Sequence, residues 1–433
     1  MNDMSRRVLT PPPDGPEEPS RPRNLRAGPF GVVDIGTTKI ACLIGRTESD
    51  GTLRVLGFGW HKGRGIRGGA ITDLEEAERA IRACVGQAED MADTRLRSVV
   101  VNLSCGLPES RLFNVQWPVG GRAVDESDIR HLVSEGRARA AGNGRDCIHV
   151  LPLMFSADDM PGIADPRGLH CTTLTARLHV IDAAATALRS LAACIARCDL
   201  DVAELVSAPM AAGLSTLVDD ERELGATVID MGGGTTGVAV FAEGQLLHTA
   251  QLPVGGAHVT NDIARILSTP VAHAERLKTL YGSVQSSPDD EREMLPVPMV
   301  GEEEHQIAKV PRSMVVNVIR PRLEETFEMV RERLKSSGLS RAAGSRVVLT
   351  GGACQLGGAR EMAARILSRQ VRLGRPGRLR GLPDSASGPP FATAAGLLAW
   401  AAGEGRTVSD INLEDERPSG FFRRVVSFLK ERV

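Results

Sequence analysis

The strongest constraint on the fold is a strand–turn–strand pattern that occurs twice, about 200 residues apart. The first copy covers residues 31–44 and the second covers residues 226–240. Both read apolar strand, Asp, apolar residue, Gly, Thr-Thr and apolar strand, and each opens a stretch in which strands alternate with helices. We therefore expect an internally duplicated α/β fold with two lobes whose hairpins face each other.

The two turns have the composition of a phosphate-binding site. Glycine allows a ligand to approach the backbone closely, so that successive N–H groups converge on an anion, and threonine adds hydroxyl donors. Asp34 and Asp230 each stand at a strand end before a turn, where they can hold a hydrated Mg²⁺. The residues expected to contact the phosphates are Gly36, Thr37, Thr38, Lys39, Gly232, Gly233, Gly234, Thr235 and Thr236.

A third glycine turn strengthens this interpretation. Gly351 and Gly352 follow the predicted strand 346–350, where a flat base can lie against backbone without a side chain in the way. A single Gly-Thr turn is usually only a turn, so the joint occurrence carries the prediction. The P-loop and dinucleotide-binding patterns are both missing from the sequence, which excludes those two nucleotide-binding classes.

Composition excludes several other functions. Lys+Arg 52 against Asp+Glu 54 leaves a net charge of −2, which argues against binding nucleic acid by bulk electrostatics. The 8 Cys form no C-x-x-C pair, which suits a reducing compartment, and Cys194 and Cys198 are expected to be buried. The His residues show no metal-ligating spacing, and the arginines of 372–380 are read as a solvated loop. We see neither a signal peptide nor an apolar stretch long enough to span a bilayer.

Hydrophobic periodicity and capping residues predict the other elements. Helices are expected at 74–91, 125–141, 183–198, 260–268, 273–281, 321–336 and from after Pro390 to about 402, and further strands at 53–60, 97–103, 202–206 and 346–350.

The last 13 residues form a distinct segment. On a helix at about 100° per residue, the apolar side chains occupy one arc of about 160°, with basic residues around it. Such a helix is typical of one lying in a membrane interface, and four cations against one acid favour anionic lipid. The alternative is a helix docked on its own domain. Against it, the acidic linker 403–420 separates this segment from the last predicted core helix and lets it extend away from the domain. The residues expected at the membrane are Phe421, Phe422, Arg423, Arg424, Val425, Val426, Phe428, Leu429 and Lys430.

These segments together resemble the superfamily of actin, the sugar kinases and the heat-shock chaperone ATPases. Five elements match in order: phosphate-1 (34–39), connect-1 (203–217), phosphate-2 (230–236), adenosine (347–352) and connect-2 (391–402). Within it, the sequence is similar to the FtsA family of bacterial cell-division proteins, on the segments 35–40, 221–225, 252–256, 260–264 and 320–325. The likeness covers about residues 29–402 and resumes at 420–433.

The resemblance implies a duplicated actin-like (ribonuclease H-like) two-lobed α/β ATPase fold. It implies a small α/β subdomain 1C at 98–182 and a C-terminal amphipathic helix at 421–433. The other expected parts are a disordered Pro-rich arm (1–28), subdomain 1A (29–97, 183–202 and 381–402), subdomain 2A (203–266 and 346–380), subdomain 2B (267–345) and the acidic linker (403–420).

By the same resemblance, Glu275 and Lys278 look like the family's nucleoside contacts, with a solvated charged helix face as the alternative. Two departures from the superfamily concern hydrolysis. Connect-1 has Ser207 where chaperone relatives carry a glutamate, and phosphate-2 is followed by Gly237 where many members carry an acid. We therefore expect ATP and Mg²⁺ to bind and hydrolysis to be slow or negligible.

The function implied is that of a filament-forming adaptor at the cytoplasmic face of the inner membrane, at the division site. Its expected partners are the C-terminal peptide of FtsZ at 2B, further copies of itself, anionic lipid, and later division proteins at 1C; no nucleic acid is expected. Two alternatives remain: a pilus-assembly adaptor of the PilM type and a small-molecule kinase, for which we find no catalytic carboxylate.

Overall fold

The computed structural model describes residues 28–301, 307–339 and 341–404. The Pro-rich arm, apart from its last residue, most of the acidic linker and the amphipathic segment 421–433 lie outside this part of the chain. The predictions for those three segments are therefore carried by the sequence alone.

Two five-stranded sheets form the centre of the molecule and are built on the same plan. In each sheet an antiparallel hairpin is followed by a parallel strand: β1 pairs with β2 and β6 in one, and β12 with β13 and β17 in the other. The first sheet has the order β11(Asp201–Ser207), β6(Ser98–Leu103), β1(Phe30–Ile35), β2(Lys39–Thr47), β3(Leu53–Lys62). The second has the order β14(Gln245–Leu252), β13(Thr236–Ala242), β12(Ala226–Met231), β17(Arg346–Thr350), β18(Gln370–Leu373). The expected duplication and two-lobed α/β fold are confirmed.

The first sheet is covered on both faces, and all six residues of β1 are buried, with Asp34 the one charged residue among them. Val33 and Ile35 face α1(Leu74–Ala92) and α3(Ala185–Arg197), whereas Val32 faces the opposite side. The expected cap of α1 is present, since the Asp73 side chain accepts hydrogen bonds from the N–H groups of Glu75 and Glu76.

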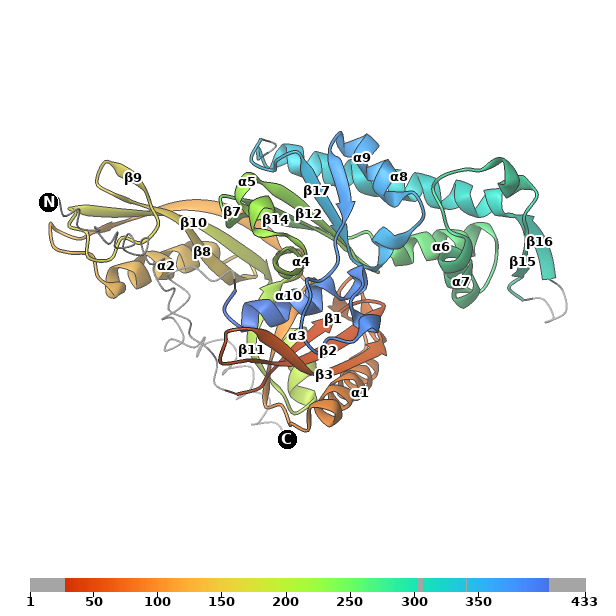
Figure 1. Ribbon diagram of the computed structural model, residues 1–433, viewed down its shortest axis with the longest axis horizontal. Coiled ribbons are helices and arrows are strands. Elements are labelled where there is room, and N and C mark those ends of the chain that lie inside the picture. Colours follow the sequence, from red (N-terminus) through yellow and green to blue (C-terminus); the bar gives the residue numbers. More distant parts are fainter. Residues whose placement is uncertain (1–27, 302–306, 340, 405–433) are drawn as a thin grey trace, which may run out of the picture.

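Two small-residue helices lie between the lobes. They are α4(Ala208–Thr216), which follows β11, and α10(Ala392–Ala401), in which every residue is buried. A helix that is apolar all round can only be stable inside a core. Both helices belong to one apolar cluster that takes Val32 from the first sheet and Val228 from the second, so they join the two lobes (Figure 1).

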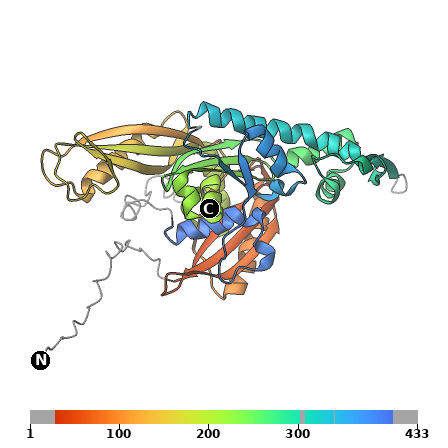
Figure 2. The ribbon, with the colours of Figure 1, turned by 45° about the horizontal axis from the view of Figure 1, so that its top comes forward.

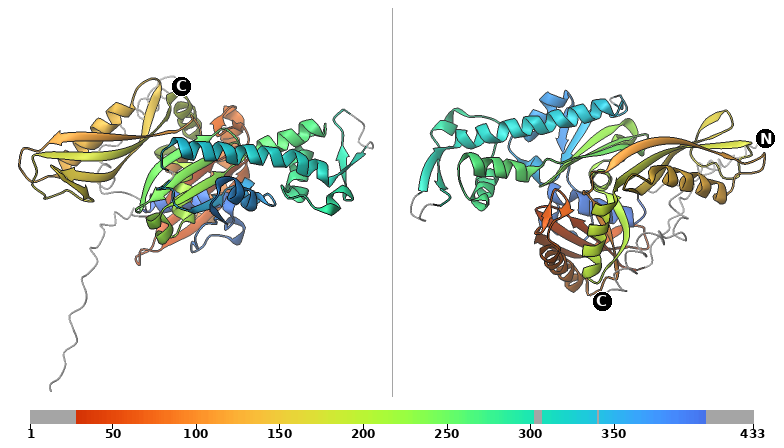
Figure 3. Two further views of the ribbon diagram at one scale, coloured as in Figure 1. Left: turned by 90° about the horizontal axis from the view of Figure 1, so that it is seen from above. Right: turned by 180° about the vertical axis from the view of Figure 1, so that it is seen from behind.

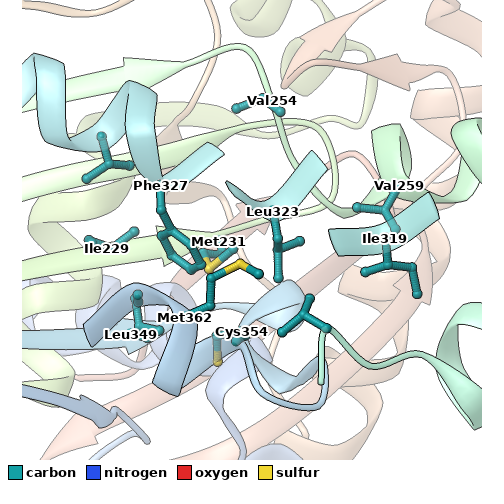
Figure 4. Close-up of a cluster of buried hydrophobic side chains, with 14 of the residues drawn as sticks. Ile229, Met231, Val254, Val259, Ile319, Leu323, Phe327, Leu349, Cys354 and Met362 are labelled. Atoms are coloured by element: carbon teal, nitrogen blue, oxygen red, sulfur yellow. The ribbon is translucent and has the colours of Figure 1, made fainter. Parts of the chain in front are cut away.

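The second lobe is held together by the long helix α8(Arg312–Ser336). Phe327 and Leu323 reach from α8 to Met231 of β12 and Met362 of α9(Ala359–Leu367), as Figure 4 shows. The prediction started this helix at Pro321, but it begins nine residues earlier, with Pro321 inside it. Buried Val315, Val316 and Ile319 continue the apolar face backwards, and this packing outweighs the break expected at proline.

Two small modules project from the centre in opposite directions along the longest axis (Figures 1 and 2). One has a sheet of order β7(Glu109–Pro118), β10(Thr173–Ala184), β8(Arg145–Ala157), β9(Met160–Ile163), with α2(Glu126–Ala140) packed on it. The other contains α6(Gly256–Ile266), α7(Val271–Tyr281) and the hairpin of β15(Met294–Pro298) and β16(Ile307–Pro311), which the sequence analysis did not predict. The views in Figure 3 show α8 running from the centre toward this second module.

The remaining described elements are short: α5(Asp219–Leu224), the two-stranded ribbon of β4(Ile66–Arg67) and β5(Ala70–Ile71), and single turns of 3-10 helix at η1(Pro288–Glu291), η2(Gly352–Gln355), η3(Asp384–Ala386) and η4(Pro389–Phe391).

The structure moves two expected domain boundaries. Strand β6 lies within the range 98–182 given to subdomain 1C, yet it pairs in parallel with β1 in the first sheet. Strand β11 likewise pairs with β6, so the first lobe extends through Ser207 and not only to residue 202. Strand partners are chosen by the tertiary fold, so a strand between two modules could not be assigned from its own sequence. Among the described helices, none has the length and apolar character needed to cross a membrane.

Candidate nucleotide-binding cleft

The two glycine turns have the same backbone geometry. Gly36 N donates to Lys39 O at 2.9 Å, and Gly232 N donates to Thr235 O at 2.9 Å. In the repeat, Thr37-Thr38 therefore correspond to Gly233-Gly234. The order of residue types had suggested that they correspond to Thr235-Thr236. One turn therefore carries hydroxyl side chains where the other presents bare backbone.

The turns face each other and fit together. A Cβ atom on Gly233 would collide with the side chain of Thr38, and one on Gly234 would collide with Thr37 Oγ1 and come within 2.9 Å of Gly68. Thr37 Oγ1 also accepts a hydrogen bond from Gly69 N at 3.1 Å. Only glycine in the second turn permits this close approach between the lobes.

Asp34 and Asp230 both line the cleft, and the charge of Asp34 acts on Asp230. Thr393 Oγ1 of α10 donates to Asp230 Oδ2 at 3.0 Å, and Lys39 Nζ lies 3.8 Å from Asp34 Oδ2. The Lys39 ammonium also donates to the carbonyl oxygen of Pro390 and sits 3.8 Å from the centre of the Phe391 ring. Lys39 is predicted from the sequence to contact the phosphates; in this structure it lines the cleft and joins the first hairpin to η4.

Burial makes this carboxylate pair electrostatically unfavourable. It raises the pKa of Asp230 to about 6, and the neighbouring charge of Asp34 adds to the shift. Burial also raises the pKa of Asp34, although Lys39 opposes the change, and it lowers the pKa of Lys39. Two buried carboxylates with one ammonium form a site that a divalent cation would stabilise.

The far end of the cleft has the features expected for a nucleoside. Lys278 Nζ donates to Glu275 Oε2 at 2.7 Å, to Thr260 Oγ1 at 2.9 Å and to Gly256 O at 3.1 Å. These groups join α6 to α7 at the cleft wall. Gly351, which also lines the cleft, has φ +82°, and a Cβ there would strike the Asp230 carboxylate, so this position must be glycine.

Together these residues surround a cleft of about 520 Å³, a volume typical of small-molecule sites. All but one of the predicted nucleotide and metal residues line it. The exception is Thr236, which is fully buried and whose hydroxyl donates to Val254 O at 2.8 Å. The assignment of Thr236 to the phosphates is therefore corrected: it belongs to β13, past the turn, and its side chain points into the lobe.

Several residues that line the cleft were not predicted from the sequence. Asn102 anchors the first turn by accepting from Ile35 N at 2.7 Å, and Thr393 holds Asp230 from α10, within the connect-2 segment but not among the residues predicted for the site. The neighbours of Asn102 are ordinary strand residues and give no signal, whereas the resemblance at connect-2 pointed to the segment of Thr393 without singling out this side chain. Gln251 did offer one, since it is a lone amide in an otherwise apolar strand end.

Comparison with known proteins gives two matching family profiles. The family described as "Cell division protein FtsA" matches residues 227–396, and "SHS2 domain inserted in FTSA" matches residues 106–182. The second range begins after β6, in agreement with the boundary found in the structure.

Curated relatives match over most of the chain. The "Cell division protein FtsA" of Agrobacterium fabrum is 41% identical over 92% of this chain and 94% of its own length. That of Rhizobium meliloti is 43% identical over 85% of this chain and 86% of its own. Among solved structures, the "PilM-PilN type IV pilus biogenesis complex" superposes with a TM-score of 0.63 at 17% identity, covering 86% of this chain and 98% of that one. At that identity, the likeness shows the fold alone.

Proposed function

Because this chain belongs to the FtsA family of cell-division proteins, we propose that it is an ATP-dependent adaptor that holds the FtsZ ring to the membrane. In this proposal the cleft binds ATP with Mg²⁺, the bound nucleotide favours assembly into filaments, and the C-terminal segment attaches those filaments to the cytoplasmic face of the inner membrane at the division site. The filament then recruits later division proteins.

The observation that carries the proposal is the meeting of the two turns. Thr37 and Thr38 of one lobe lie against Gly233 and Gly234 of the other, and Asp34 and Asp230 line the same cleft. A ligand in the cleft that binds both turns contacts both lobes at once, so its binding free energy can fix the angle between the lobes. Filament contacts that require one angle are thereby linked to nucleotide binding.

Each part of the cleft has a role in this proposal. The turn N–H groups and the Thr37 and Thr38 hydroxyls would hold the phosphates, and Asp34 and Asp230 would hold Mg²⁺ through its waters. Bound Mg²⁺ supplies charge neutralisation for the phosphate oxygens. Glu275 and Lys278 would contact the ribose and base, with Gly351 and Gly352 giving the base a flat backbone surface.

The membrane segment is proposed from its sequence. Residues 421–433 combine a bulky apolar arc with four cations, and an isolated helix of this length binds only weakly. A filament presents many such segments together, so assembly strengthens attachment by avidity. Anionic lipid adds about 1 kcal/mol per basic residue near the surface.

Two surfaces are proposed for protein partners. Subdomain 2B presents exposed apolar side chains suited to an FtsZ C-terminal peptide: Val271, Leu280, Met294, Val300 and Ile307. On the sheet of subdomain 1C, a shallow hollow of about 400 Å³ is a candidate site for later division proteins, lined by Leu112, Asn114, Met154, Ser156, Thr175 and Arg177.

One experiment tests cleft and tether together. The full chain is sedimented with anionic and with zwitterionic vesicles, with and without Mg²⁺-ATP, and filaments are imaged on lipid monolayers by electron microscopy. We expect co-sedimentation and filaments only with anionic lipid and Mg²⁺-ATP, and a loss of both on deletion of residues 421–433. Gly234→Ala should abolish filaments because its Cβ strikes the opposite turn, whereas Gly86→Ala, with open space around it, should not. Unchanged sedimentation without the tail would refute the tether.

The alternatives predict different results. A pilus adaptor of the PilM type shares the fold but reaches the membrane through partner proteins, so it would not sediment with pure lipid. A kinase would transfer phosphate from ATP to a sugar or carboxylic acid, and robust transfer in such a screen would displace the proposal.

A further inference from the structure

Gln251 has a buried polar group in the cleft without a partner. Its side chain is 7% exposed and lines the cleft, and its Oε1 atom forms no hydrogen bond within the described part of the chain. A buried amide oxygen that lacks a partner costs about 1–3 kcal/mol. Such a group in a binding cleft indicates a partner that arrives with the ligand.

The sheet register brings Gln251 into line with Asp230. Asp230 of β12 is opposite Gly237 of β13, and Gly237 is opposite Gln251 of β14. Residues opposite each other in a sheet point to the same face, so the carboxylate and the amide lie on one face two strands apart, about 10 Å between backbones. Gly237, between them, has no side chain, so no side chain separates Gln251 from Asp230 along this row.

The amide leans into the space over Gly237. A Cβ on Gly237 would lie 3.0 Å from Gln251 Oε1 and 2.9 Å from Pro209 Cβ, so the oxygen stands above Gly237 beside the start of α4. This is the phosphate end of the cleft, since β13 starts directly after the second turn. The nucleoside groups Glu275 and Lys278 come from α7 and are bonded to each other.

The acidic side chains that line the cleft already have a proposed role or a hydrogen-bond partner. Asp34 and Asp230 form the cation site, and Glu275 is held by Lys278 and by Thr260. Ser207, before α4, and Gly237, in β13, carry no carboxylate. Among the described residues that line the cleft, Gln251 is therefore the buried polar side chain whose oxygen has no hydrogen-bond donor.

We propose that Gln251 orients the water that attacks the terminal phosphate of ATP. This rests on the proposed function of the cleft. The water oxygen forms a bond to the terminal phosphorus, the bond from that phosphorus to the ADP oxygen breaks, and the proton leaves to a phosphate oxygen or to solvent. The amide accepts one hydrogen bond from the water and takes no proton, so hydrolysis is slow, and it depends on an amide at position 251.

The test compares binding with hydrolysis in the full chain. ATP affinity is measured by calorimetry with Mg²⁺ and a non-hydrolysable analogue, and phosphate release is measured in single turnovers. We expect Gln251→Leu to bind within about twofold of the unaltered protein and to release phosphate about tenfold more slowly or worse. Gln245→Leu, on the same strand but outside the cleft, is the matched control and should change neither.

Gln251→Glu separates orientation from mere packing. A carboxylate can both orient water and accept its proton, so phosphate release should recover relative to Gln251→Leu and rise with pH as the glutamate ionises. Gln251→Asn, which shortens the side chain while keeping the amide, serves if the leucine variant does not fold.

Two outcomes overturn the inference: Gln251→Leu binding ATP and releasing phosphate at the unaltered rate, or an unaltered protein that binds ATP and releases none. Failure of the unaltered protein to bind ATP would instead refute the proposed function of the cleft, so the two failures are distinguishable.

Discussion

At the residue scale, the protein keeps a carboxylate pair where folding alone does not favour one. The pKa of Asp230 is about 6 in the folded chain because of burial and Asp34, against about 3.8 when unfolded. Between these values the folded chain holds a proton that the unfolded chain has lost. Stability without ligand therefore falls as the pH rises from about 4 to 6, by up to about 3 kcal/mol for this group.

Asp230→Asn should remove this destabilising charge from the folded chain, and with it a carboxylate that the proposed Mg²⁺ site needs. We expect the variant to be more stable than the unaltered protein at pH 7.5 without nucleotide, with a flatter pH profile between 4 and 6. It should also lose Mg²⁺-dependent ATP affinity. Urea unfolding across this pH range, with and without Mg²⁺-ATP, measures both. Asp220→Asn, exposed on α5, is the control; an identical pH profile for Asp230→Asn would contradict the assignment.

At the element scale, α8 shows how packing overrides local preference. Pro321 lies ten residues inside the helix on its exposed side, where it cannot donate to the carbonyl of residue 317. The helix persists because its apolar residues pack continuously across the second lobe, from Val315 to Leu334. The helix therefore still carries the loss of folding free energy that Pro321 causes.

Pro321→Ala should therefore stabilise the second lobe. Restoring a helix donor and removing the ring clash is expected to raise the unfolding free energy by about 1–3 kcal/mol, read from urea denaturation. Glu328→Ala, an exposed site on the same helix, should change it by less than about 0.5 kcal/mol. Loss of stability in Pro321→Ala would mean that the proline sets a bend that the packing requires.

At the scale of the whole molecule, the two lobes are joined where α4 crosses α10. Gly396 of α10 lies directly on the backbone of Ala211 in α4, and a Cβ there would collide with that carbonyl. Because α4 continues from the first sheet and packs on the second, the separation of these helices helps to set the angle between the turns (Figure 1).

Gly396→Ala should disturb both stability and binding. Overpacking at this contact is expected to cost about 1–3 kcal/mol, and the altered lobe angle should weaken ATP binding about tenfold or more. Urea denaturation and calorimetry give the two values. Gly86→Ala, also in a helix but with open space around it, should be neutral or stabilising. Normal ATP affinity in a destabilised Gly396→Ala would show that the helices support the fold without setting the cleft.

The sequence by itself determined the repeated plan, since an apolar strand ending in Asp and a glycine turn is specified by neighbouring residues. It likewise determined the cap at Asp73, and all but one of the residues that it assigned to nucleotide and metal line the cleft. What only the tertiary structure decided are features that depend on partners far along the chain. These are the membership of β6 and β11 in the first sheet, the contact of Lys39 with Pro390, the inward direction of Thr236 and the row that aligns Gln251 with Asp230. Strand order and side-chain direction are set by which segments share a core, and no local pattern carries that information.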